Sequence, residues 1–156
     1  MSNNVRDDIL LLIEDNPADA DLTRDSFVQA NSPLRIEVAS DGVEAMSYLN
    51  RENQYHDAVR PRLILLDLNL PRLDGREVLR EVKANEHLRR IPVIVWSSSR
   101  AGKDVSDCYD LGANCYLVKP LDLRAYRDVI NTVERFWIET ACLPSNNGAS
   151  GLPCTT

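Results

Sequence analysis

The sequence lacks several features that mark particular classes of protein. None of its apolar runs approaches the roughly 20 residues that a membrane-spanning helix needs, so we expect no membrane segment. Its first residues, Met1–Asp8, are polar and acidic, unlike a secretory signal peptide. The four cysteines form no C-x-x-C pair and show no metal-ligand spacing. These absences predict a cytoplasmic protein in which Cys108 and Cys115 are reduced core thiols.

Positive charge is also scarce. The 156 residues include 18 lysines and arginines against 24 aspartates and glutamates, which gives a formal net charge of −6. Because proteins bind nucleic acid through clustered Lys and Arg, this balance argues against a nucleic-acid partner. The length favours one domain, which we expect to span 1–143. The remainder, 144–156, is rich in Ser, Asn, Gly and Thr without a periodic pattern, and we expect it to be a disordered tail.

Short apolar runs alternate with amphipathic stretches along the chain. The runs are ILLLI (9–13), LRIEVA (34–39), LILL (63–66), PVIVW (92–96) and CYLV (115–118). Three of them are nearly continuous in Val, Ile and Leu, as expected of strands buried on both faces of a parallel sheet. Five strand–helix repeats predict a doubly wound α/β domain with a five-stranded parallel sheet, of the flavodoxin-like class.

The sequence also marks where helices begin. Asn16 before Pro17 predicts an N-cap followed by a first-turn proline. Asp74 has the spacing of a capping residue, so we assign it a structural role. The last helix is expected to be extended, from near Asp122 to about Ala141.

Polar residues stand at four of the predicted strand ends. Right-handed crossovers bring these ends to one edge of the sheet, and the residues there are Glu14, Asp15, Asp67, Ser97 and Lys119. Three carboxylates at close range repel one another unless they are neutralised, and Mg²⁺, or Mn²⁺ as the alternative ion, would neutralise them. An ionised Asp67 is then a nucleophile toward phosphorus, giving an acyl phosphate whose oxygens the cation and Lys119 stabilise.

These residues resemble the receiver domains of two-component response regulators. The resemblance covers roughly Ile9 to Ala141. It rests on the acidic pair after the first strand, on LLDLNLPRLDG around Asp67, on Ser97 after PVIVW, and on Lys119 within NCYLVKP. Because these motifs follow four different strands, their joint occurrence is specific.

Carried over by position, the resemblance implies a role for each residue around the phosphoryl group. Asp67 would accept this group from a histidine kinase, and Ser97 and Lys119 would hold it. Tyr116 would change rotamer when Ser97 moves, although a static core tyrosine explains its pattern equally well. The bond between Lys119 and Pro120 would be cis.

The resemblance also implies a ligand set for the metal. Asp15 and Asp67 would bind the ion through their carboxylates, and Asn69 through its backbone carbonyl. Glu14 would act largely through water. Trp96 is bulkier than the aliphatic residue usual at its position, and we expect its packing to affect the coupling between the site and the fourth helix.

Two further segments resemble a narrower group. IEDNPADADLTR near the start and ERFWIETACLP near the end are similar to single-domain regulators that serve cyanobacterial phytochromes. This resemblance implies a light-regulated histidine kinase as the phosphodonor. Because the chain leaves no room for a DNA-binding domain, we expect its output to be a protein contact or onward phosphotransfer.

The last predicted helix carries more apolar residues than one sheet face needs. One stripe at helical spacing is expected to face the sheet: Tyr126, Ile130, Val133 and Trp137. Val129, Phe136 and Ile138 fall outside it, and we expect them to contact a partner or a second copy of this chain. The alternative is that the tail folds back and covers them.

Other functions for a strand-end aspartate are less consistent with the sequence. Phosphohydrolases of the dehalogenase type normally carry a second acid two residues later, where this chain has Asn69. A flavodoxin-like cofactor binder needs a phosphate-cradling loop after the first strand, whereas Glu14 and Asp15 repel phosphate. We therefore predict no enzyme activity beyond self-phosphorylation and slow autodephosphorylation. A receiver-like interaction module that works without phosphorylation stays open, and Ser98 and Ser99 are expected to be ordinary loop residues.

Overall fold

The apolar runs of the sequence form the strands of one parallel sheet. The computed structural model describes residues 8–144, and within them the strand order is β2-β1-β3-β4-β5. The strands are β1 (Ile9–Ile13), β2 (Arg35–Ala39), β3 (Leu63–Leu66), β4 (Val93–Ser97) and β5 (Cys115–Val118). All pairs are parallel, so the predicted fold class is confirmed and the strand bounds differ from the predicted runs by at most one residue.

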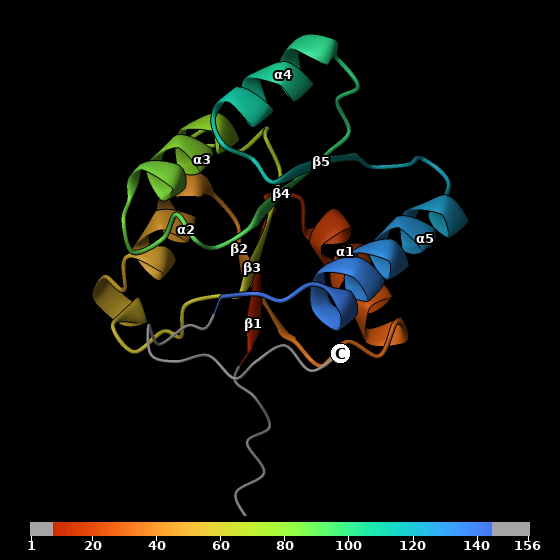
Figure 1. Ribbon diagram of the computed structural model, residues 1–156, viewed down its shortest axis with the longest axis horizontal. Coiled ribbons are helices and arrows are strands. Elements are labelled where there is room, and N and C mark those ends of the chain that lie inside the picture. The colour runs from red at the N-terminus through yellow and green to blue at the C-terminus, as the bar shows by residue number, and fades with distance from the viewer. Residues whose placement is uncertain (1–7, 145–156) are drawn as a thin grey trace, which may run out of the picture.

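Helices cover both faces of this sheet. They are α1 (Pro17–Gln29), α2 (Gly42–Leu49), α3 (Gly75–Ala84), α4 (Gly102–Asp110) and α5 (Leu123–Val133), with a short 3₁₀ helix, η1 (Asn53–Tyr55). Figure 1 shows α1 and α5 together on one face, and α2, α3 and α4 on the other. In the described part of the chain, no helix has the length and apolar character needed to cross a bilayer.

The last helix is extended, as predicted, but its final part is wound differently. Residues Glu134–Thr140 (η2) continue α5 as a π-helix, and the helical segment ends at the capping residue Ala141. The segment begins at the N-cap Asp122, whose carboxylate accepts a hydrogen bond from the N–H of Ala125 at 2.9 Å. Most of the predicted tail, residues 145–156, lies outside the described residues, and so does the start of the chain before residue 8.

Two apolar layers sandwich the sheet because strand side chains alternate between its faces. Each of the five residues of β1 is at most 1% exposed, which is why this strand reads as an uninterrupted apolar run. Leu11 and Ile13 join the core beneath α2, α3 and α4, whereas Leu10 and Leu12 join the core beneath α1 and α5. The predicted stripe of the last helix lies in the second core, with Trp137 at its partly buried end.

Trp96 belongs to the core beneath α1 and α5, on the face opposite α4. Its ring meets that of Tyr126 edge-on, with centroids 5.0 Å apart. Its indole N–H donates to the hydroxyls of Thr23 and Tyr126, at 3.4 and 3.3 Å. Strand alternation turns Trp96 to the face opposite the fourth helix, and an effect of its packing on the coupling between the site and that helix stays a prediction.

Candidate functional site

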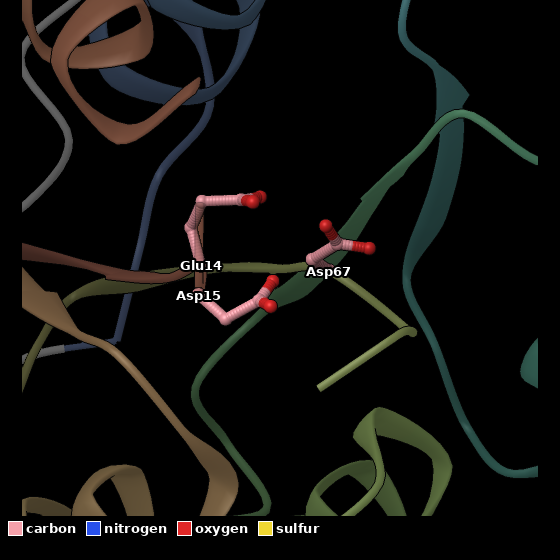
Figure 2. A group of neighbouring side chains, drawn as sticks. All are labelled: Glu14, Asp15 and Asp67. Atoms are coloured by element: carbon pink, nitrogen blue, oxygen red, sulfur yellow. The ribbon is translucent and has the colours of Figure 1, made fainter. Parts of the chain in front are cut away.

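Three carboxylates converge at the carboxyl edge of the sheet, as predicted. Glu14 and Asp15 follow β1 and Asp67 follows β3, and the neighbouring strands end level because Ile13 pairs with Leu66. Each carboxylate offers one oxygen within 4.8 Å of those of the other two. Figure 2 shows the Glu14 and Asp15 side chains extending toward Asp67.

Glu14 is the most deeply buried acid of the three, at 3% exposure. Burial raises the pKa of its carboxyl from 4.5 to about 7, and the neighbouring Asp67 carboxylate adds to the shift, while Lys119 opposes it. The N–H of Asn16 donates to its Oε1 at 3.2 Å. Glu14 therefore gains or loses its proton easily near neutral pH.

Lys119, at the end of β5, places its ammonium among the carboxylates. Its Nζ lies 2.7 Å from Oε2 of Glu14 and 3.2 Å from Oδ2 of Asp67. A third acid, Asp19, lies 3.5 Å away. Burial alone would lower the pKa of Lys119, but these carboxylates raise it above its ordinary value, so the group is a permanent cation.

The negative charge at this edge exceeds what one ammonium neutralises. Asp15 is exposed and makes no ion pair with any described residue, while Glu14 and Asp67 share Lys119. Oxygen ligands on three carboxylates, facing one another and partly open to solvent, are the donor set that Mg²⁺ and Mn²⁺ prefer. The arrangement fits a divalent cation.

The loop between β3 and α3 holds Asp67 in position through its backbone. The N–H of Asn69 donates to Oδ1 of Asp67 at 3.3 Å. The N–H of Gly75 donates to the carbonyl of Leu68 at 3.0 Å, which folds the start of α3 against the strand end. A Cβ on Gly75 would lie 2.4 Å from the carbonyl oxygen of Asp67, so the close approach requires glycine. Asp74 caps α3, as predicted.

Ser97 is fully buried at the end of β4. Around it lie residues whose role at the site was not predicted from the sequence: Ser99, Asp104 and Arg76. The Ser97 hydroxyl oxygen accepts a hydrogen bond from the N–H of Ser99 at 3.2 Å. The Ser99 hydroxyl donates to Asp104 of α4 at 2.5 Å, and Asp104 pairs with Arg76 of α3. Ser99 therefore joins the site to two helices and is more than a loop residue.

Tyr116 lies beside the same loop. Its hydroxyl donates to the carbonyl oxygen of Ser99 at 2.9 Å, and its backbone N–H donates to the hydroxyl of Tyr109 at 3.2 Å. Tyr116 is only partly buried and packs against the core beneath α2, α3 and α4. The predicted switch residue is thus in contact with the loop that follows Ser97.

Two expectations need correction. The described residues contain no cis peptide bond, so the bond between Lys119 and Pro120 is trans, the isomer that remains lower in energy even before proline. The apolar surface of the last helix is also smaller than expected. Of the three residues expected there, Val129 and Ile138 are partly buried and pack against the core, and Phe136, at 54% exposure, faces solvent. Ile138 lies in the π-helical η2, whose winding departs from the 3.6-residue pattern, whereas Val129 lies in the regular helix α5.

Comparison with known proteins agrees with this geometry. The model of the response regulator receiver domain family matches residues 10–131. The response regulator Rcp1 of Synechocystis sp. is 42% identical over 137 residues, covering 88% of this chain and 93% of the relative. A probable methanogenesis regulatory protein, FilR2 of Methanothrix harundinacea, is 38% identical over 130 residues, covering 83% of each chain.

Solved structures agree as well. The phosphorylated cyanobacterial phytochrome response regulator RcpA superposes with a TM-score of 0.86 at 44% identity, covering 90% of this chain and all of that one. The Mn²⁺-bound form of Rcp1 superposes with a TM-score of 0.84 at 41% identity, covering 88% of this chain and 99% of that one. Sequence, fold and strand-end carboxylates point the same way, and the chain belongs to the response regulator receiver domain family.

Proposed function

We propose that this receiver domain accepts a phosphoryl group on Asp67 and signals through the phosphorylated state. The observation that carries the proposal is the position of the Asp67 carboxylate, 3.2 Å from the Lys119 ammonium and facing two further carboxylates. In the reaction, an Asp67 oxygen forms a bond to phosphorus as the bond from phosphorus to the donor atom breaks. The leaving group departs with the electron pair of that bond.

The residues around Asp67 hold the transferred phosphoryl group and respond to it. Lys119 balances charge on the transferred oxygens, and the hydroxyl of Ser97 donates to one of them. To do so, Ser97 turns away from Ser99, and Tyr116 changes rotamer as the loop adjusts. Because Ser99 also contacts Asp104, the adjustment reaches α4.

A divalent cation completes the site in this proposal. Asp15, Asp67 and the backbone carbonyl of Asn69 hold it, and Glu14 contributes through water. When bound, it neutralises charge on the carboxylates and on the phosphoryl oxygens. The solved Mn²⁺-bound form of Rcp1 supports a divalent cation in this chain by similarity.

The similarity to characterised response regulators suggests the binding partners of this protein. Because RcpA is a phytochrome response regulator and is 44% identical, we infer a phytochrome-type histidine kinase as the phosphodonor. The output is a protein contact or onward phosphotransfer, in the cytoplasm. Beyond self-phosphorylation and slow autodephosphorylation, no catalytic turnover is part of this proposal.

Intact mass spectrometry tests the phosphorylation directly. The protein is incubated with Mg²⁺ and acetyl phosphate beside an Asp67→Asn variant, with an Asp110→Asn variant as a control for loss of one acid. We expect a single base-labile phosphoryl group on the wild type and the control, absent from the Asp67 variant and abolished by chelator. Modification of the Asp67 variant would contradict the assignment. A wild type that neither gains mass nor binds beryllofluoride would instead favour an interaction module that works without phosphorylation.

The exposed Phe136 supports a contact with a second copy of this chain. Its ring stands edge-on to Trp137, with centroids 5.3 Å apart, and it is the exposed member of the predicted surface with Val129 and Ile138. Sedimentation velocity of the Phe136→Ala variant tests this, with Val28→Ala as the control, since Val28 is an exposed apolar residue of α1. A dimer lost only in the first variant is expected. A monomeric wild type, with and without phosphorylation, would exclude the homodimer.

A further inference from the structure

Asp19 lies at the solvent-facing opening of the site, which we call its mouth. It is not among the three carboxylates that face one another, Glu14, Asp15 and Asp67. It lies in the first turn of α1, shortly after the acidic pair that follows β1. The Asn16 side chain caps this turn by accepting hydrogen bonds from the N–H groups of Ala18 and Asp19, at 2.9 and 3.1 Å. This cap fixes the backbone of Asp19 beside the strand end, and its Oδ2 lies 3.5 Å from Nζ of Lys119.

The side chain of Asp19 is more exposed to solvent than those of Glu14 and Asp67, the other two partners of Lys119. The side chains of Glu14 and Asp67 are 2% and 12% exposed, whereas that of Asp19 is 43% exposed. The two distances at Lys119 place Oδ2 of Asp19 less than 7 Å from Oδ2 of Asp67. Asp19 is therefore a solvent-facing negative charge close to the point of phosphoryl transfer.

The charges at the mouth do not cancel. With all of them ionised, Glu14, Asp15, Asp19 and Asp67 leave a formal charge of −3 against the single Lys119. A divalent cation reduces this charge without reversing it, and Asp19 is not one of its proposed ligands. An incoming phosphodonor, itself an anion, meets this uncompensated charge first.

We propose that Asp19 is a specificity-determining residue for phosphorylation, which selects against doubly charged free phosphodonors such as acyl phosphates. The inference rests on the function proposed above. A dianionic acyl phosphate is repelled more strongly than a P–N donor of single net charge, because Coulomb energy scales with the charge of the donor. Asp19 thus disfavours free acyl phosphates at Asp67 more strongly than P–N donors that carry a single net charge.

Both reactions balance without a further reactant. With acetyl phosphate, the bond between Asp67 and phosphorus forms as the acyl O–P bond breaks, and acetate leaves as an anion. With phosphoramidate, whose nitrogen is already protonated, the N–P bond breaks and neutral ammonia leaves. The two donors deliver the same phosphoryl group and differ in their charge on approach.

Initial rates of phosphorylation by the two donors test the inference, in excess Mg²⁺ and at low salt. The Asp19→Asn variant should react faster with acetyl phosphate, by roughly three- to tenfold, and faster with phosphoramidate by only about two- to threefold. High salt should reduce both ratios toward one, because exposed charges are screened. The matched control is Asp21→Asn, since Asp21 is an exposed acid of the same helix that makes no ion pair with any described residue, and its rates should equal those of the wild type.

The Asp19→Glu variant, which keeps the charge, should restore the wild-type preference. That result separates charge selection from a structural role of Asp19 in α1. Equal acceleration with both donors, no acceleration, or a Glu variant that behaves like the Asn variant would each overturn the inference while the wild type still becomes phosphorylated. A wild type that neither donor phosphorylates would overturn the proposed function and this inference with it.

Discussion

In the absence of divalent cations, we expect the wild-type protein to lose stability as pH rises. We expect the Glu14→Gln variant not to show this loss. The cause is the burial of the Glu14 carboxyl, which raises its pKa from 4.5 to about 7. Below pH 4.5 the group is protonated in both the folded and the unfolded protein and contributes nothing. Between pH 4.5 and about 7 the folded state alone keeps the proton, so stability falls as pH rises through this window.

The magnitude follows from the size of the shift. A difference of about 2.5 pKa units, at about 1.4 kcal/mol for each unit, corresponds to about 3 to 4 kcal/mol of unfolding free energy. Because the Glu14 side chain is 2% exposed, solvent does not screen this contribution. The Glu14→Gln variant lacks the titrating group, so its stability relative to the wild type should rise by this amount across the window.

Urea unfolding in chelator, followed by tryptophan fluorescence between about pH 5 and about pH 8, measures the difference between the two proteins. The informative quantity is its change with pH, because the substitution also removes a partner of Lys119 at every pH. In saturating Mg²⁺ the pH dependence should shrink, since a bound cation favours the ionised carboxylate. A difference that stays constant with pH in chelator would refute the reasoning.

Two further predictions concern packing. Glu134 is buried at 2% exposure, and neither carboxylate oxygen makes a hydrogen bond of ordinary geometry with a described residue; burial raises its pKa, while the nearby Ser32 side chain lowers it. Glu134→Met should therefore stabilise the protein at neutral pH by about 1–3 kcal/mol in urea unfolding, and a loss of stability would show that the acid is needed. Gly75→Ala should cost about 3 kcal/mol in the same assay and slow phosphorylation, because its Cβ would strike the Asp67 carbonyl oxygen. The control is Gly102→Ala, where a Cβ meets nothing within 4 Å, and equal effects of the two substitutions would contradict this explanation.

The strands and the acidic edge could be predicted because they depend on rules that act locally. A central parallel strand is buried on both faces, so β1 and β3 appear in the sequence as continuous apolar runs. The handedness of the crossovers then brings every strand end to one edge, whatever the details of packing. This is why Glu14, Asp67 and Lys119 could be placed together without knowledge of any side-chain contact.

The winding of the last helix could not be predicted in the same way. A 3.6-residue period assigns Tyr126 and Ile130 to the core, and both are buried. Beyond Val133 the period still places Trp137 against the core, but the π-helix also turns Ile138 against it, which the period does not predict. The change of winding begins at Glu134, whose burial a pattern built on apolar residues does not predict.

The residues around Ser97 escaped prediction for another reason, which is that their partners are distant in the sequence. Asp104 and Arg76 are 28 residues apart, and each lies in an amphipathic helix where a charged residue is ordinary. Only the packing of α3 beside α4 brings them together and lets Asp104 hold Ser99. Asp19 is similar, because its meeting with Lys119 joins the first helix to the last strand. Topology therefore identifies the atoms that react, whereas the groups that tune them depend on how neighbouring elements pack.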